Sequence, residues 1–176
     1  VSLKGWAGVF VSHENNKSYG VKVNLDGKVT AVDDINGGTG IGVYVNGNIK
    51  DKTNYPIINI TDNANITSSG DGIYNAGYAV INIGKAYISG VEAGIAIKSG
   101  TLNIDGATVT SSGEDGTPTE GFSNGINRSG TAIQMESNSG YAGNMNLNID
   151  SGTFKSKNSY VIYEYIGKGS NTLVNN

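Results

Sequence analysis

The sequence predicts an all-β protein that winds into a parallel β-solenoid, and three observations lead to this prediction. First, its 176 residues include 27 glycines and only two prolines, and glycine permits the frequent turns that short strands need. Second, the strand-favouring residues Ile, Val, Tyr and Thr recur at regular intervals. Third, three short segments follow one another in a fixed order along the chain, which indicates a repeat architecture.

The first segment of each repeat is an aliphatic–Asn–aliphatic triplet. It occurs five times, with its asparagine at positions 24, 59, 82, 103 and 148. A small or turn-forming residue follows each triplet, so we expect a short strand that ends at a corner. Because side chains alternate along a strand, the two aliphatic residues of a triplet share one face. The pattern leaves open whether the asparagine between them faces outward or lies in a corner between sheets.

Two further short runs complete each repeat. The second run alternates polar and aliphatic residues, and the third starts with glycine or a small residue and continues with aliphatic ones. The second runs are Lys28–Thr30, Asn65–Ser68, Tyr87–Ser89, Thr108–Ser111 and Thr153–Ser156. The third runs are Gly40–Val45, Gly72–Tyr74, Gly94–Ile97, Thr131–Met135 and, more loosely, Tyr160–Tyr165. Three runs per repeat predict three short sheets.

The spacing of the triplets defines the repeat length. Successive asparagines are 35, 23, 21 and 45 residues apart, so the unit is about 22 residues long and the longer intervals hold insertions. The main insertion, 112–129, is expected to be a loop within a single solenoid domain that spans 1–176 and belongs to a larger surface protein. One unit cannot bury its own aliphatic face, whereas copies stacked at the ~4.8 Å strand spacing can. We expect about five to seven coils.

A β-sandwich and a β-trefoil or propeller are the competing architectures. Sandwich domains show about seven strands with turn signals every ~8–12 residues, whereas the runs here are shorter and recur in threes. The open ends of a solenoid need caps, and we expect Trp6 and the atypical N-terminal residues to supply one.

Two segments carry a resemblance to a known family. They are LNIDGATVTSSG at Leu102–Gly113 and the long stretch Gly130–Tyr165. From Ile57 onward the chain resembles the right-handed parallel β-helices of the pectin-lyase-like superfamily. It is also similar to Gly/Asn/Thr-rich repeat regions of large surface proteins from gut Firmicutes. The resemblance is one of repeat style without a catalytic motif. It implies a right-handed parallel β-helix that is secreted or displayed on a bacterial cell surface.

Composition disfavours several classes of function. The net charge of −3 and the single arginine, Arg128, leave no basic stripe for nucleic acid. No apolar run reaches the ~18 residues of a membrane span. With no cysteine and one histidine, His13, the usual ligands of a zinc site are lacking. We therefore expect no nucleic acid partner, no membrane insertion and no cofactor.

A polysaccharide-active enzyme, a lyase or glycoside hydrolase, is the alternative hypothesis that the resemblance raises. Such hydrolases need paired carboxylates on adjacent coils, beside a histidine and basic residues. Asp33–Asp34 and Glu114–Asp115 are adjacent carboxylates, but both are expected in solvated turns or loops. His13 is isolated, and Arg128 stands alone at the base of the insertion, where a surface ion pair is expected. We expect no catalytic site.

Calcium binding is a weaker hypothesis. Five aspartates follow strands or lie in turns, where carboxylate and carbonyl oxygens can converge. The ordinary role of aspartate after a strand is turn formation, so we expect no metal. These aspartates are Asp62, Asp71, Asp105, Asp115 and Asp150.

Aromatic residues and the insertion are the remaining candidates for recognition. Exposed aromatic rings can stack on sugars, although aromatic residues also cover cores, and loops on a rigid scaffold often carry binding sites. The candidate ligand-binding residues are Glu120, Phe122 and Arg128 in the insertion, and Tyr74 and Tyr78 in the central repeats. The expected function is a non-catalytic surface module, a spacer or adhesin, whose partners are a host or cell-wall glycan or protein and neighbouring domains of the same polypeptide. A scaffold that self-associates through open sheet edges is a third hypothesis.

Overall fold

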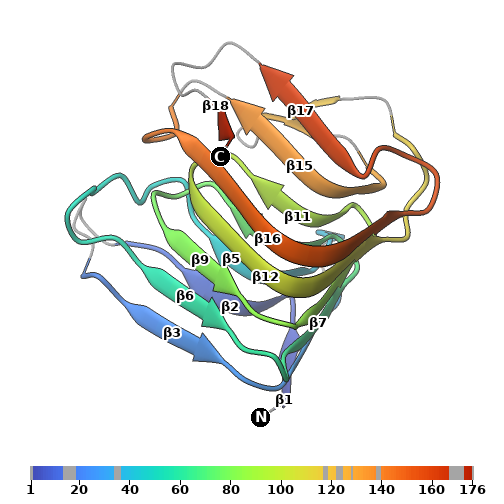
Figure 1. Ribbon diagram of the computed structural model, residues 1–176, viewed down its shortest axis with the longest axis horizontal. Coiled ribbons are helices and arrows are strands. Elements are labelled where there is room, and N and C mark those ends of the chain that lie inside the picture. Colours follow the sequence, from blue (N-terminus) through green and yellow to red (C-terminus); the bar gives the residue numbers. More distant parts are fainter. Residues whose placement is uncertain are drawn as a thin grey trace.

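The computed structural model describes residues 2–13, 19–33, 37–116, 119–121, 125–127, 129–137, 140–166 and 173–175. Within these ranges every regular element is a β-strand and there is no helix. Figure 1 shows that the long strands curl strongly around the interior of the molecule. The prediction of an all-β chain with parallel sheets is confirmed. Since the described residues contain no helix, none of them forms a helix suited to cross a membrane.

The residues that the structure describes form eighteen strands. They are β1 (Ser2–Gly5), β2 (Ala7–Val11), β3 (Lys22–Leu25), β4 (Lys28–Ala31), β5 (Ile41–Val45), β6 (Ile57–Ile60), β7 (Asn65–Ser68), β8 (Asp71–Asn75), β9 (Val80–Ile83), β10 (Tyr87–Gly90), β11 (Ala93–Ile97), β12 (Gly100–Ser111), β13 (Thr119–Gly121), β14 (Gly125–Asn127), β15 (Thr131–Ser137), β16 (Met145–Ser156), β17 (Ile162–Ile166) and β18 (Leu173–Asn175).

The three runs of each repeat occupy two parallel sheets, and not the three that the sequence predicts. First-run and second-run strands belong to one ten-stranded sheet, because β12 and β16 each continue through the corner between the two runs. Gly106 lies at this corner of β12 with φ +90°, which a residue with a side chain rarely adopts. The strand therefore bends there while its pairing with β16 continues beyond a register shift.

The third runs form a separate six-stranded sheet in the order β17-β15-β11-β8-β5-β2. Each of its neighbouring pairs is parallel. The insertion 112–129, which the sequence predicts as a loop, contains the short antiparallel pair β13–β14. This insertion thus has regular structure of its own.

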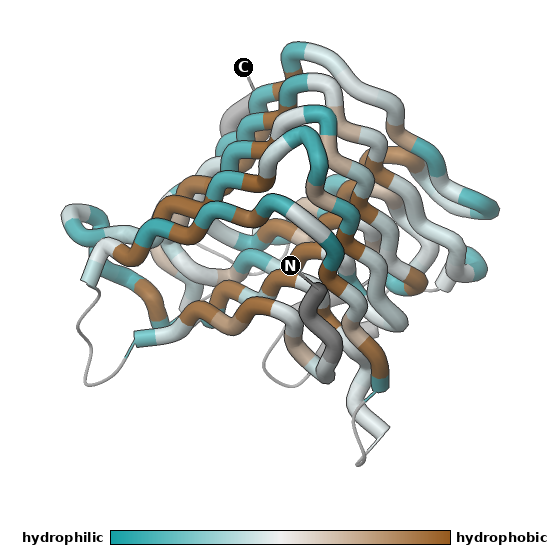
Figure 2. Tube along the Cα trace, turned by 90° about the horizontal axis from the view of Figure 1, so that it is seen from below, coloured by the Kyte–Doolittle hydropathy of each residue, from teal (hydrophilic) through white to brown (hydrophobic). Residues whose placement is uncertain are grey.

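Equivalent aliphatic residues lie side by side between successive strands. Ile60, Ile83 and Ile104 are in register through β6, β9 and β12, and all three are buried. In the second runs Ile66 and Ile88 pair in the same way. Figure 2 shows hydrophobic positions lying next to one another from strand to strand. Because each fully buried Ile contributes roughly 1.5–3 kcal/mol, these rows hold the stack together.

Glycine begins the third run because the strands approach closely there. A Cβ at Gly72 would lie 2.5 Å from the carbonyl oxygen of Gly94, and one at Gly94 would lie 2.7 Å from that of Ala132. These distances are shorter than a carbon–oxygen contact tolerates. The recurring glycine therefore reflects packing between repeats.

The N-terminal residues that were expected to form a cap are strands of the two sheets. β1 pairs with β4 and β2 pairs with β5, both in parallel. Trp6 lies between β1 and β2, and its ring centroid is 6.1 Å from that of Tyr44. Trp6 is 38% exposed.

Candidate functional site

A row of aromatic side chains crosses the outer face of the six-stranded sheet. Phe10, Tyr44 and Tyr74 are in register on β2, β5 and β8. Their ring centroids are 5.1 Å and 5.2 Å apart, with planes inclined by only 14° and 18°. Trp6 contacts Tyr44 beside them. We call Trp6, Phe10, Tyr44 and Tyr74 the aromatic row.

The aromatic row changes from exposed to buried along its length. Phe10 is 53% exposed and Trp6 is 38% exposed, whereas Tyr74 is 3% exposed. Alternation along the strands explains why these rings lie outside, since Ile73 on the same strand points into the main core. The end of the row at Trp6 and Phe10 is thus aromatic surface that solvent reaches.

A buried polar cluster lies next to the inner end of the aromatic row. Lys98 and Glu136 form an ion pair in which both side chains are almost fully buried. They directly follow Ile97 and Met135, which are in register on β11 and β15. Lys98 Nζ also lies 5.9 Å from the ring centroid of Tyr74. We call Asp71, Lys98 and Glu136 the polar cluster.

Burial shifts the acid–base properties of this cluster. Desolvation, together with the negative charge of Glu92, raises the pKa of Asp71 to about 7, although Lys98 and the Ala93 N–H oppose the shift. Desolvation lowers the pKa of Lys98, and the Glu136 carboxylate opposes this. Burial also raises the pKa of Tyr74. Asp71 can therefore exchange a proton near neutral pH.

A short segment between β15 and β16 covers the inner end of the aromatic row. We call residues 140–144 the strap. The hydroxyl oxygens of Tyr141 and Tyr74 are 3.4 Å apart. The Ser99 hydroxyl donates a hydrogen bond to the carbonyl of Ala142, and Gly100 N–H donates to that of Asn144 at 3.1 Å. These contacts fasten the strap across neighbouring turns.

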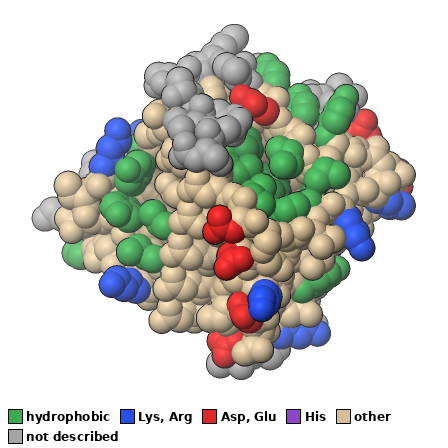
Figure 3. Space-filling view, in the orientation of Figure 1, with side chains coloured by type: hydrophobic (Ala, Val, Ile, Leu, Met, Phe, Trp, Pro, Cys, Tyr) green, Lys and Arg blue, Asp and Glu red, His purple; other side chains and the backbone are tan. Residues whose placement is uncertain are grey.

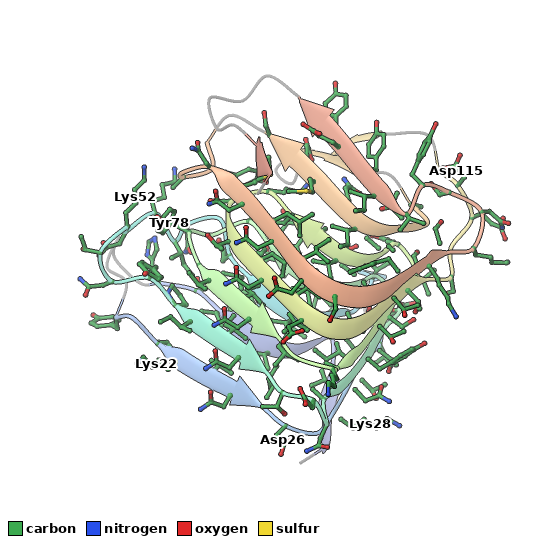
Figure 4. All side chains as sticks on the ribbon, viewed as in Figure 1. Lys22, Asp26, Lys28, Lys52, Tyr78 and Asp115 are labelled. Carbon is green, nitrogen blue, oxygen red and sulfur yellow. The ribbon has the colours of Figure 1, made fainter. Side chains whose placement is uncertain are left out.

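Tyr78 contacts the same strap. A Cβ at Gly143 would lie 2.6 Å from the Tyr78 ring, so only glycine fits there. Tyr55 meets Tyr78 edge-on at 5.5 Å between ring centroids. Lys52 Nζ lies 5.9 Å from the centroid of the Tyr78 ring, and Figure 4 labels these two residues. The two tyrosines that the sequence nominates are thus both held by the strap.

The other nominated residues lie in the insertion. Phe122 and Arg128 lie outside the described residues. Glu120 belongs to β13, where its backbone pairs with Ile126 of β14. Glu114, at the start of the insertion, is bonded to Lys157 at 2.7 Å, and Asp115 accepts a hydrogen bond from Ser159 at 2.7 Å. Glu114 and Asp115 therefore connect the start of the insertion to the segment that follows β16.

The asparagines of the triplets form a second surface feature, on the ten-stranded sheet. Their side chains face outward and form a ladder in which each amide N–H donates to the side-chain oxygen of the preceding asparagine, at 2.7–2.9 Å. This answers the question of orientation that the sequence left open. The ladder consists of Asn24, Asn59, Asn82, Asn103 and Asn148.

A shallow groove of about 270 Å³ runs beside this ladder. Its polar lining comes from Asn59, Asn82, Asn103, Asp105 and Asp150. Figure 3 shows acidic side chains gathered along the middle of this face of the molecule. We call the groove lined by these asparagines and aspartates the asparagine groove.

Two of the aspartates that the sequence offers as calcium ligands, Asp62 and Asp105, have structural partners. Asp62 accepts a hydrogen bond from Lys85 N–H at 2.8 Å, and Asp105 accepts one from the Ser151 hydroxyl at 3.1 Å. Within the described ranges, no three His, Cys, Asp or Glu side chains come together as metal ligands would.

Sequence inspection missed the polar cluster, although a signal was present. Lys98 and Glu136 each follow the third run of their repeat, so they occupy equivalent positions in neighbouring repeats. Opposite charges at equivalent positions of stacked strands are expected to pair. Burial of this pair depends on what covers the sheet, which the repeat alone does not specify.

Comparison with known proteins adds no relative. No protein-family model, curated protein or solved structure matched the chain.

Proposed function

We propose that the chain is a right-handed parallel β-helix in which first, second and third runs form successive coils. Parallel pairing between equivalent runs of consecutive repeats supports this proposal. Counting coils by complete sets of three runs gives the units β3–β5, β6–β8, β9–β11, β12 with β15, and β16 with β17. With partial coils at either end, the proposed count is about five to seven coils.

We further propose that this β-helix is a non-catalytic glycan-binding module of a bacterial surface protein, acting as a spacer or adhesin. The observation that carries the proposal is the exposed end of the aromatic row, Trp6 with Phe10 stacked on Tyr44. Flat aromatic rings at a solvent-exposed surface offer the face on which the C–H groups of a sugar stack. Large exposed apolar side chains gathered in one place are typical of an interaction site.

The test is glycan binding by the chain and by its aromatic variants. We expect Trp6→Ala and Phe10→Ala each to weaken binding about three- to tenfold, because each removes one stacking surface. A glycan array identifies a ligand, and calorimetry measures its affinity for each variant. Tyr87→Ala is the matched control, since Tyr87 is 39% exposed on β10 of the other sheet. If both aromatic variants bind like the original chain, the aromatic row is not the site.

A polysaccharide-active enzyme is the second candidate, and the polar cluster favours it. Asp71, with a pKa near 7, has the property of a general acid, and Glu136 supplies a second carboxylate on the same sheet. If the chain is an enzyme, it releases reducing ends or unsaturated products from polysaccharides. Asp71→Asn then abolishes this release, while Asp51→Asn, in the turn before β6, retains it. Absence of products from every polysaccharide tested leaves the binding module as the function.

A further inference from the structure

We propose that the asparagine groove binds a neutral, hydroxyl-rich chain, such as an uncharged polysaccharide, laid along the stack of strands. This site is separate from the aromatic row, which lies on the other parallel sheet. The proposal rests on the hydrogen-bonding capacity, the direction and the charge of the groove.

The ladder leaves hydrogen-bonding capacity at the surface. A side-chain amide has two N–H donors and two acceptor lone pairs. Asn82 donates one N–H to Asn59 and accepts one from Asn103, which leaves it a second donor and a second lone pair. Asn59 and Asn103 are placed in the same way between their own neighbours. These three side chains are partly exposed, so a ligand can reach the remaining donors and acceptors.

The groove runs across the strands. Its lining comes from β6, β9, β12 and β16, which are neighbours in the sheet. Parallel strands repeat at ~4.8 Å, so the groove offers the same amide at β6, β9 and β12 in turn. A linear ligand with a regular repeat of hydroxyl groups can bond to several amides at once. A compact ligand would use only one.

The charge of the groove disfavours an anionic ligand. The two charged residues in its lining are Asp105 and Asp150. A carboxylate accepts hydrogen bonds from hydroxyl groups and repels another carboxylate or a sulfate. Polymers of uronic acids are therefore expected to bind less well than neutral ones.

Gly84 deepens the groove beside Asp105, on the side away from Asp150. It follows its triplet where Asp105 and Asp150 follow theirs, and it lines the groove without a side chain. A Cβ at Gly84 would collide with the Asp62 carboxylate, which is bonded to the Lys85 N–H. The contact with Asp62 that favours glycine at position 84 therefore also leaves space in the groove for a ligand.

The first test measures retardation of the chain in gels containing dextran, arabinoxylan or galactomannan, which are neutral, or polygalacturonate, which is acidic. We expect retardation by at least one neutral polymer. Asn82→Leu is expected to weaken it about fivefold or more, because it removes an amide from the middle of the groove. Asn24→Leu is the matched control, since it also breaks a ladder bond but lies outside the groove. Thermal unfolding of each variant verifies that it is folded.

A second variant leaves the ladder intact. The double substitution Asp105→Asn with Asp150→Asn keeps the shape of the groove and removes its charge. We expect it to increase retardation by polygalacturonate about threefold or more. The proposal is overturned if no neutral polymer retards the chain, if Asn82→Leu and Asn24→Leu act equally, or if polygalacturonate binds the original chain more tightly than the neutral polymers do.

The double variant Trp6→Ala with Phe10→Ala separates this proposal from the function proposed above. Groove binding persists in that variant and is weakened in Asn82→Leu. If instead the aromatic double variant loses all binding and Asn82→Leu loses none, the aromatic row is the glycan site and the groove proposal fails alone.

Discussion

At the scale of single residues, Asp71 is the side chain whose environment differs most from what the sequence indicates. The sequence places it in a turn as a calcium candidate, whereas it begins β8 and is 8% exposed. Its carboxyl group is close to Glu92 and Lys98 and accepts a hydrogen bond from the Ala93 N–H, and Lys98 in turn pairs with Glu136. A carboxyl group held this way prefers its neutral form.

This environment makes stability depend on pH in a defined direction. The pKa of Asp71 rises from 3.8 in the unfolded chain to about 7 in the folded one. Between these values the folded state binds a proton that the unfolded state lacks, so Asp71 lowers the free energy of unfolding as pH rises from about 4 to 7. The stabilisation that protonated Asp71 gives the folded state is fully present below about pH 4 and is lost above about pH 7.

Replacing Asp71 with Asn removes this dependence. We expect Asp71→Asn to be more stable than the original chain at pH 8, by on the order of 1–3 kcal/mol, because no charge is buried. The advantage shrinks as the pH falls toward 4. Urea unfolding of both proteins at pH 4, 6 and 8 measures the difference. A difference that stays constant over this range contradicts the assignment.

At the scale of elements, pairing between neighbouring strands decides which residues meet. The polar cluster exists because β11 and β15 pair in parallel with Ile97 opposite Met135, which brings the following residues, Lys98 and Glu136, together. The asparagine ladder has the same origin in β3, β6, β9, β12 and β16. In both cases the interaction joins residues that are 21 or more positions apart in the chain.

The buried ion pair between β11 and β15 gives a test of this pairing. We expect Lys98→Met to lower the free energy of unfolding by about 3–5 kcal/mol, because it leaves the Glu136 carboxylate buried without its partner. The double variant Lys98→Met with Glu136→Leu is expected to recover most of the loss, since both charges are gone. Urea unfolding at pH 7 measures all three proteins. Equal losses in the single and double variants would show that the pair is not coupled.

At the scale of the whole molecule, the stack has two outer faces with different chemistry. The six-stranded sheet carries the aromatic row and the polar cluster, and the ten-stranded sheet carries the asparagine groove. Both faces rest on one continuous hydrophobic core, which includes residues from Val11 to Leu147. Each face is therefore a rigid surface on which side chains recur at the spacing of the strands.

Much of the fold was predictable from the sequence because the repeat is local. The triplets, the alternating second runs and the glycine-led third runs all form strands where the pattern indicates, and Ile60, Ile83 and Ile104 pair as equivalent residues should. The number of sheets was not predictable, since it depends on whether a strand continues through its corner. Gly106 allows β12 to do so.

Some features of the candidate sites were likewise predictable from the sequence, and others were not. The sequence determined which residues recur at equivalent positions, so it already specified that the five asparagines are neighbours and that Lys98 lies opposite Glu136. Only the tertiary structure decided that the asparagines face outward, that Phe10 is exposed while Tyr74 is covered by the strap, and that Asp71 is buried. The reason is physical: periodicity fixes which side chains are neighbours, whereas exposure and charge state depend on what the rest of the chain lays over them.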